Sequence, residues 1–395
     1  MSDERIAVDP RSLGLGQLFL KFLGFGARAF GGPVAQIAMV REELIARERW
    51  IDPARFNRLL AVLQALPGPE AHELCVHLGM VARGRIGGVL AGLGFMLPGL
   101  ALMLVAGWAY VTWVGRFPAL AGVLLGVQVV VLAIILRAVV RIGQHILEER
   151  LLWAIGIGSL AATLMGVPFW LLLIAGGAVY ALWSRRWMAI AVTVIVVLLA
   201  ALLHQRAPTS AVTIAASDAS MLALFVAGLK GGLLTFGGAY TAIPYVRSDT
   251  VGRGWIDDAN FLDGIALAGV LPAPLVIFAT FVGYVAGGLP GALAITAGMF
   301  LPAFAFSLIL FERMEALVES AAFHRLLNGV AAAVVGIVAA TLVDLARVVA
   351  RSLANPLLAL LLFVVALAIA WRVRGGWVTP ALILIGAVTG ALIAL

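Results

Sequence analysis

The sequence is poor in charged residues, and it contains a single cysteine and only two lysines. Charged residues make up 12% of the 395 residues, whereas an ordinary soluble domain contains about a quarter. The chain is 63% hydrophobic, with a mean hydropathy of +1.09. A soluble core cannot bury this much apolar surface, so the composition excludes a soluble globular protein and indicates an integral membrane protein.

The scarcity of cysteine and charge excludes several kinds of site. Cys75 is alone, which excludes a disulfide framework and a multi-cysteine metal site. His72, His145, His204 and His324 show no ligand spacing, so we expect no bound metal and no cofactor. Arginines gather in short loops, as the positive-inside bias requires, so the net charge of +7 does not indicate a nucleic-acid partner. The first seventeen residues lack an apolar core, and we expect no cleavable signal peptide there.

The apolar residues form continuous runs rather than an alternating pattern. This predicts an all-α polytopic membrane protein and excludes a transmembrane β-barrel. The runs cover roughly residues 17–40, 54–82, 87–114, 117–141, 150–166, 168–184, 187–204, 219–246, 259–286, 289–311, 325–347, 353–371 and 376–395.

Most of the stretch 18–98 returns later in the chain, at an offset of 204 to 206 residues. Repeated glycines and prolines at matched places, inside very apolar sequence, indicate a two-fold internal repeat. The recurring motifs are Phe30-Gly31-Gly32 with Phe236-Gly237-Gly238, Trp50-Ile51-Asp52 with Trp255-Ile256-Asp257, Pro67-Gly68-Pro69 with Pro272-Ala273-Pro274, and Leu97-Pro98 with Leu301-Pro302.

The repeats define the expected organisation of the chain. It comprises a cytoplasmic tail, a first transporter repeat, a linking transmembrane segment with a polar linker, and a second repeat, at 1–16, 17–186, 187–218 and 219–395. If every segment crosses the membrane, the unmatched segment 187–204 inverts the second repeat relative to the first. The alternative is that 17–40 and 54–82 are re-entrant hairpins. In both cases the arginine distribution predicts a cytoplasmic N-terminus.

The Gly-Gly-Pro and Pro-Gly-Pro motifs interrupt apolar segments. Proline removes a backbone donor and glycine frees the chain to turn, and proline also favours the first position of a helix. Half-helices are therefore predicted to start near Pro33, Pro69, Gly238 and Pro274. Helix starts present unpaired N–H groups to anions, so we predict that the four breaks converge near the midplane and bind a small anion. The alternative is that they are ordinary kinks for helix packing.

Three basic residues precede the Phe-Gly-Gly motifs: Lys21, Arg28 and Lys230. Charge inside an apolar segment is costly and is a candidate for function, although Lys21 has snorkelling to the interface as an alternative. The predicted anion site comprises Lys21, Arg28, Gly31, Gly32, Pro33, Pro67, Gly68, Pro69, Lys230, Gly237, Gly238, Pro272 and Pro274.

Titratable residues follow Pro69 in the first repeat only. Glu70, Glu73 and His77 fall at i, i+3 and i+7, on one face of the expected half-helix, and Glu73 and His77 are spaced for an i,i+4 pair. A carboxylate and an imidazole that exchange protons fit proton coupling. The alternative is a structural pair that satisfies nearby backbone groups.

At these motifs the sequence resembles the chromate ion transporter family, in its long two-domain form, over nearly the whole chain. The similar motifs are FGGPVAQ at 30–36, LPGP at 66–69, TFGGAYT at 235–241, LPAPL at 271–275 and GMFLPAF at 298–304. The resemblance implies a secondary transporter with two antiparallel halves. It also implies that the protein exports chromate across the bacterial inner membrane, driven by the membrane potential or a proton gradient, and so confers chromate resistance.

Alternatives to this assignment stay open at the level of the sequence. Chromate and sulfate are tetrahedral dianions of similar size, so a sulfate-type uptake carrier is the first alternative. The rival from another class is an intramembrane enzyme or an assembly factor, but the apolar segments contain no nucleophile or metal cluster, and we expect no enzymatic activity. Pro272-Ala273-Pro274 lacks the central glycine, which predicts a less open break. Membrane lipid is an expected partner, and a homodimer is compatible with the sequence.

Overall fold

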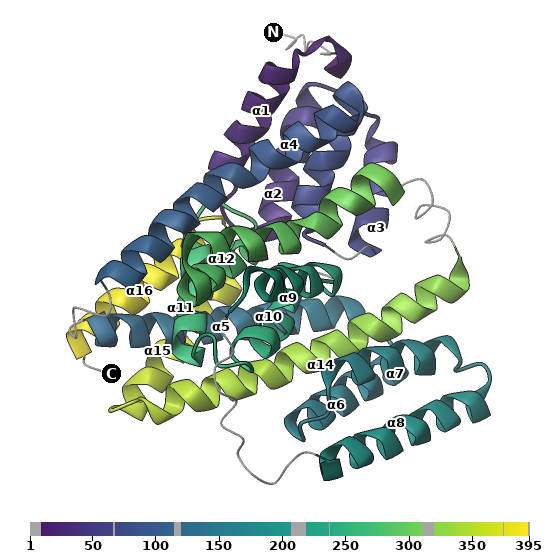
Figure 1. Ribbon diagram of the computed structural model, residues 1–395, viewed down its shortest axis with the longest axis vertical. Coiled ribbons are helices and arrows are strands. Elements are labelled where there is room, and N and C mark those ends of the chain that lie inside the picture. The colour runs from purple at the N-terminus through teal and green to yellow at the C-terminus, as the bar shows by residue number, and fades with distance from the viewer. Residues whose placement is uncertain are drawn as a thin grey trace.

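The computed structural model describes residues 9–65, 68–113, 120–206, 219–236, 238–310, 320–373 and 375–393, and these residues form helices and short connections without a strand (Figure 1). After η1 (Pro10–Ser12) near the N-terminus, the first repeat contains α1 (Leu15–Ala27), α2 (Gly32–Val40), η2 (Arg41–Arg47), α3 (Pro53–Ala65), α4 (Glu70–Trp113), α5 (Leu120–Ile146), α6 (Arg150–Leu164) and α7 (Phe169–Ala181). After α8 (Arg186–Arg206), the second repeat contains α9 (Met221–Leu233), η4 (Ala239–Ala242), α10 (Ile243–Thr250), α11 (Asp258–Val270), η5 (Leu275–Ile277), α12 (Phe278–Ala305), η6 (Phe306–Leu310), α14 (Ala321–Arg351), α15 (Pro356–Arg372) and α16 (Val378–Ile393).

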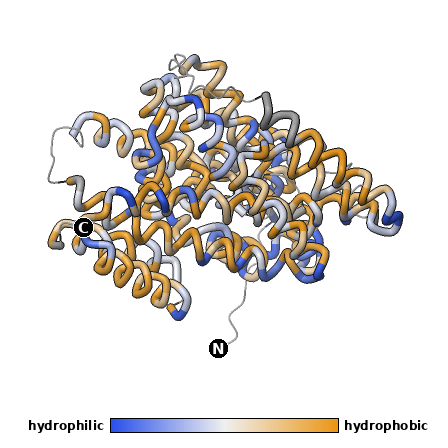
Figure 2. Tube along the Cα trace, turned by 90° about the horizontal axis from the view of Figure 1, so that it is seen from below, coloured by the Kyte–Doolittle hydropathy of each residue, from blue (hydrophilic) through white to orange (hydrophobic). Residues whose placement is uncertain are grey.

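The helices suit a lipid environment. Four of the described helical stretches are long and apolar enough to cross a membrane, namely Glu70–Trp113, Gly122–Ile146, Leu275–Ile309 and Phe323–Arg351. Peripheral helices expose large apolar side chains such as Trp187 and Leu357. Figure 2 shows that hydrophobic residues predominate along most of the helices. The chain is therefore a polytopic helical membrane protein.

The two repeats share a backbone interruption that the apolar runs do not reveal. Within α4, Arg83 has φ −139° and ψ 33°, and Gly84 has φ 61° and ψ −158°. Within α12, Gly287 has φ −150° and ψ 22°, and Gly288 has φ 61° and ψ −157°. The second residue of each pair has a left-handed φ that glycine adopts without strain. The segments predicted separately at 54–82 and 87–114 are thus joined by a kink within α4 rather than by a loop.

The first and fourth helices of each repeat meet through glycine. A Cβ atom at Gly26 of α1 would lie 2.3 Å from the Phe95 carbonyl oxygen of α4. In the second repeat, a Cβ atom at Gly232 of α9 would lie 2.3 Å from the Met299 carbonyl oxygen of α12. Small residues of this kind let two backbones approach closely in a membrane. The first helix of each repeat therefore packs closely on the fourth, as α1 on α4 and as α9 on α12.

Gly26→Ala is expected to lower the melting temperature of the purified protein, because its methyl group must displace a backbone carbonyl. Overpacking a tight contact costs about 1–3 kcal/mol. Gly16→Ala on the same helix is the matched control, since nothing lies within 4 Å of its Cβ position. Alanine also favours a helix by about 1 kcal/mol over glycine. Equal melting temperatures for the two variants would contradict the close α1–α4 contact.

The repeats interlock through their long fifth helices. α5 of the first repeat packs along α15 and α16, whereas α14 of the second repeat packs along α6 and α7 (Figure 1). Glycines again form the contacts: a Cβ at Gly126 would lie 2.1 Å from the Gly386 oxygen, and a Cβ at Gly329 would lie 2.2 Å from the Gly176 oxygen. The exchange is reciprocal, as a pseudo-two-fold relation between the repeats requires.

The repeats differ at their third helix. α11 lies inside the bundle, against α5, α12, α14 and α16, and most of its side chains are buried. Its counterpart α3 packs on α4 and η2 and exposes Arg55 and Arg58. The two repeats share one order of helices, but their third helices pack differently, so the two halves of the protein are not equivalent.

Candidate functional site

Both breaks of the first repeat end at a helix start. α2 begins at Gly32, with Gly31 as its N-cap, and the two glycines have left-handed φ values of 80° and 88°. Pro33 follows as the second helical residue. α4 begins at Glu70, directly after Gly68 and Pro69. Proline and glycine therefore stand where a chain must stop one helix and start another.

The second repeat has helix starts at the matched places. Gly238 is the N-cap of η4, which continues directly into α10. Pro274 is the N-cap of η5, which continues directly into α12. Pro272 is buried beside it. Pro67 and Gly237, which also belong to the predicted site, lie outside the described residues.

Hydrogen bonds join the breaks of one repeat to those of the other. The Gly68 N–H, between α3 and α4, donates to the Thr235 carbonyl between α9 and η4 at 2.8 Å. The Gln36 side-chain amide of α2 donates to the Ala29 carbonyl at 2.8 Å and to the Ala273 carbonyl at 3.0 Å. Gln36 is only 1% exposed. The four breaks thus meet in crosswise pairs, first with fourth and second with third.

Gln36 was not among the predicted site residues. A polar side chain inside an apolar helix start is a signal that sequence reasoning can use, because a buried amide needs partners.

The fourth break also shows how Ala273 replaces the glycine of the first repeat. Its methyl group packs on Gly99 of α4, where a Cβ atom would lie only 2.3 Å from the Ala273 Cβ. Ala273 is 4% exposed, so this break is filled by packing.

The structure places both predicted lysines against carboxylates. Lys21 pairs with Glu48, which also accepts a hydrogen bond from Trp50 Nε1 at 2.8 Å. Lys230 lies 3.1 Å from Asp249 in the second repeat. Each first helix is therefore tied by one lysine to the segment that follows its break, and the positive charge of each lysine has an acidic partner.

Two arginines lie near the breaks: Arg28 is near the first break along the chain, and Arg137 is near the third break in space. Arg28 caps α1 at its C-terminal end, is exposed, and donates through Nε to the Gly24 carbonyl at 2.9 Å. Arg137 of α5 is half-buried, and α5 packs beside η4, which contains Tyr240. Arg137 was not among the predicted site residues. Only the packing of α5 beside η4 shows its position.

The titratable residues after Pro69 lie in the first turns of α4. The Glu73 side chain is fully buried and folds back toward the break, where a Cβ atom at Gly68 would lie 2.3 Å from Glu73 Oε1. Neither Glu73 oxygen has a hydrogen-bond partner among the described residues. The predicted i,i+4 pair of Glu73 with His77 is therefore not joined by a hydrogen bond, because the Glu73 carboxyl group lies against Gly68 instead. Glu70 lies beside Glu73 and interacts with it electrostatically.

Comparison with known proteins agrees with this architecture. The chromate transporter family matches residues 16–182 and again residues 222–391. A chromate transport protein of Pseudomonas aeruginosa is 56% identical over 92% of this chain and 89% of its own length. A chromate transport protein of Cupriavidus metallidurans is 30% identical over 84% of this chain and 83% of its own length. No solved structure matches the chain. With its two matching halves, this chain belongs to the chromate transporter family.

Proposed function

We propose that this protein is a secondary transporter that exports chromate across the bacterial inner membrane, driven by the membrane potential or a proton gradient, and confers chromate resistance. The observation that carries the proposal is the crosswise hydrogen bonding of four helix breaks, two from each repeat. Irregular backbone inside a membrane is tolerated where protein or a watery cavity surrounds it. Family membership and the names of the relatives support chromate as the substrate.

The charge of chromate sets what the site must supply. A dianion that leaves water is very costly to bury unless donors and positive charge replace its hydration. A helix start contributes about 0.3–2 kcal/mol, so four starts do not offset that cost alone. In this proposal Arg28 and Arg137 supply positive charge beside the breaks. Lys230 and Lys21 take part only if chromate displaces Asp249 or Glu48 from them.

The proposal includes inverted repeats and a cytoplasmic N-terminus. The first repeat spans 17–186, the second 219–395, and 187–218 links them. The reciprocal packing of α5 and α14 supports a pseudo-two-fold axis in the membrane plane. Ala54→Cys and Ala259→Cys, at exposed equivalent positions, are expected to react with an impermeant thiol reagent from opposite sides of the membrane in a Cys75→Ala background. Labelling from the same side would exclude the inversion.

Gly32→Asn is expected to preserve the fold and to abolish chromate binding. Asparagine tolerates the left-handed φ of 80° at this position. Nothing lies within 4 Å of the Cβ position, so the side chain enters open space in front of the α2 start, which the substrate must approach. Gly166→Asn, with φ 82° and equally open surroundings after α6, is the control. Parental chromate affinity in Gly32→Asn, measured by equilibrium dialysis, would place the substrate elsewhere.

Flux of labelled chromate into inverted membrane vesicles tests the proposed function. We expect chromate to accumulate when a potential or pH gradient is imposed, with sulfate, molybdate and phosphate competing more weakly than unlabelled chromate. Uptake of sulfate by right-side-out vesicles, without chromate accumulation in inverted ones, would overturn the proposal in favour of the sulfate carrier.

A further inference from the structure

A buried polar cluster joins the two repeats away from the helix breaks. It contains Tyr110 of α4, Gln128 of α5, and Asn260 and Asp263 of α11. Asp263 is 2% exposed, and its Oδ1 accepts a hydrogen bond from Gln128 Nε2 at 3.0 Å. The Tyr110 hydroxyl oxygen lies 2.5 Å from Asn260 Oδ1 and 2.6 Å from Asp263 Oδ2. Two helices of the first repeat thus hold one carboxyl group of the second.

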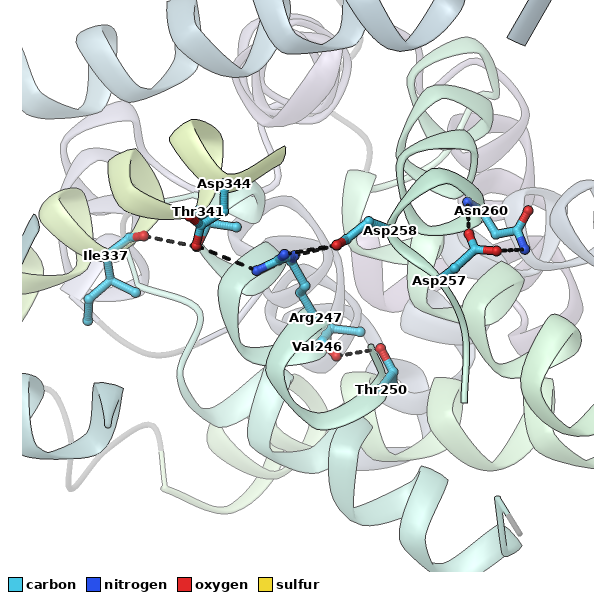
Figure 3. Close-up of polar contacts among 9 residues, drawn as sticks. All are labelled: Val246, Arg247, Thr250, Asp257, Asp258, Asn260, Ile337, Thr341 and Asp344. Carbon is cyan, nitrogen blue, oxygen red and sulfur yellow. Dashed lines mark hydrogen bonds and ion pairs between the residues drawn. The ribbon is translucent and has the colours of Figure 1, made fainter. Parts of the chain in front are cut away.

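The orientation of the Asn260 amide is fixed by Asp257. Asn260 Nδ2 donates to Asp257 Oδ2 at 3.0 Å, and the Asn260 backbone N–H donates to Asp257 Oδ1 at 2.7 Å (Figure 3). The hydrogen-bond network assigns the two ends of an amide side chain. The nitrogen end is committed to Asp257, so the end that faces Tyr110 is an oxygen, which accepts and cannot donate.

The protons around Tyr110 can then be counted. Two short O···O contacts each need one proton, and the tyrosine hydroxyl supplies one. The amide oxygen of Asn260 supplies none. If Tyr110 donates to Asn260, the contact between Tyr110 and Asp263 needs a proton on the carboxyl group of Asp263.

We propose that Asp263 is a proton-binding site of the transporter, occupied in this conformation, with Tyr110 and Gln128 as its hydrogen-bond partners. This inference rests on the proposed secondary transport and names a second site for its coupling ion, separate from Glu73. The oxygen bonded to Gln128 is the carbonyl end of the neutral carboxyl, and the oxygen bonded to Tyr110 carries the proton.

A cleft gives the site a route to the surface. The cleft has a volume of about 540 Å³, and its lining includes Trp255, Asp257, Asn260 and Val285. Asn260 lines the cleft and also contacts Tyr110. Asp257, Asn260, Tyr110 and Asp263 therefore form one hydrogen-bonded chain between the cleft and the buried carboxyl group.

Asp258 of α11 and Asp344 of the neighbouring α14 are already paired. Asp258 receives two hydrogen bonds from Arg247, at 2.6 and 3.1 Å, and Arg247 lies 3.9 Å from Asp344 of α14 (Figure 3). Asp344 also pairs with Arg347. α12 and α16 present neutral groups to α11: Phe281 faces Gly264, and Thr379 and Ile383 face Gly269. Asp257 thus remains as the unneutralised charge that acts on Asp263.

Loss of the proton changes the contact between the repeats. Ionised Asp263 accepts the Tyr110 proton, and Asn260 Oδ1 then faces the hydroxyl oxygen without a proton between them. That short contact becomes repulsive, so α4 and α11 must separate or re-pair at this point. Proton release is in this way linked to the relative position of the two repeats, which alternating access requires.

Infrared spectroscopy of the purified protein tests the proton site without chromate or a gradient. The parent is expected to show a carboxylic-acid C=O band that disappears as the pH is raised. Asp263→Asn should lose this band and keep its melting temperature, because an amide donates to Tyr110 and accepts from Gln128 as the protonated acid does. Tyr110→Phe should shift the band, since the acid loses its acceptor. Glu73→Gln, which removes another buried acid, and the surface variant Glu43→Gln should both retain the Asp263 band.

Vesicle flux gives the second readout. The parent's chromate flux is expected to respond to an imposed pH gradient, and Asp263→Asn should lose that response. If Asp263→Asn loses no carboxylic-acid band, or Tyr110→Phe shifts none, the proton site is overturned. Absence of chromate flux with the band assigned to Asp263 contradicts the proposed function alone, because the band is measured without transport.

Discussion

Gln36→Leu is expected to abolish chromate export and to destabilise the protein by about 2–6 kcal/mol, or about 1–3 kcal/mol for each of two carbonyls left without a donor. The buried Gln36 amide donates to Ala29 and Ala273, which belong to different repeats. Leucine has a similar size but no donor, so the variant removes the hydrogen bonds while the volume of the buried side chain stays nearly the same. The melting temperature and vesicle flux measure the two effects.

The control for this change is Gln64→Leu on α3, where the glutamine is exposed. Both variants make the same chemical substitution, so a difference between them reports the buried hydrogen bonds. If Gln36→Leu exports chromate at the parental rate, the two breaks do not need to be held together for transport.

Glu73→Gln is expected to eliminate most gradient-driven export and its dependence on pH. Chromate should still protect the variant against thermal unfolding, because substrate binding stabilises the folded state whether or not coupling works. Glutamine has the shape of glutamate and fits above Gly68, but it cannot release a proton. The buried carboxyl of Glu73 has no hydrogen-bond partner among the described residues, which suits a group that must be neutral when enclosed.

Glu42→Gln serves as the control for Glu73→Gln, since Glu42 is 61% exposed and pairs with Arg47 at the surface. Normal export by Glu73→Gln across the whole pH range would make the buried acid a structural group. Asp263 would then be the one proton site of this account.

Sequence reasoning located the breaks because their causes are local. Proline cannot donate to a helix and glycine accepts left-handed backbone, so Gly31, Gly32, Pro69 and Pro274 mark helix starts without any tertiary information. The repeat was visible for the same reason, since such residues recur at matched positions. Arg83, by contrast, fell between the predicted segments 54–82 and 87–114. An arginine followed by a glycine does not distinguish a loop from a kink within one helix.

The contacts between repeats could not be predicted in this way. Gln36 and Ala273 are 237 residues apart, and Tyr110 and Asp263 are 153 apart. No local pattern specifies which of many apolar helices will lie together. Asp263 had a usable signal, an acid inside an apolar helix, but it was not among the predicted site residues. Lys21 and Lys230 were found, but their partners Glu48 and Asp249 were not.

The most direct test of the central claim is to locate bound chromate by anomalous diffraction at the chromium absorption edge in crystals of the protein. We expect one peak where the breaks meet, within reach of the α2 and α4 helix starts and of Arg28 or Arg137. A peak beside Lys21 and Glu48, beside Lys230 and Asp249, or away from all four breaks would contradict it.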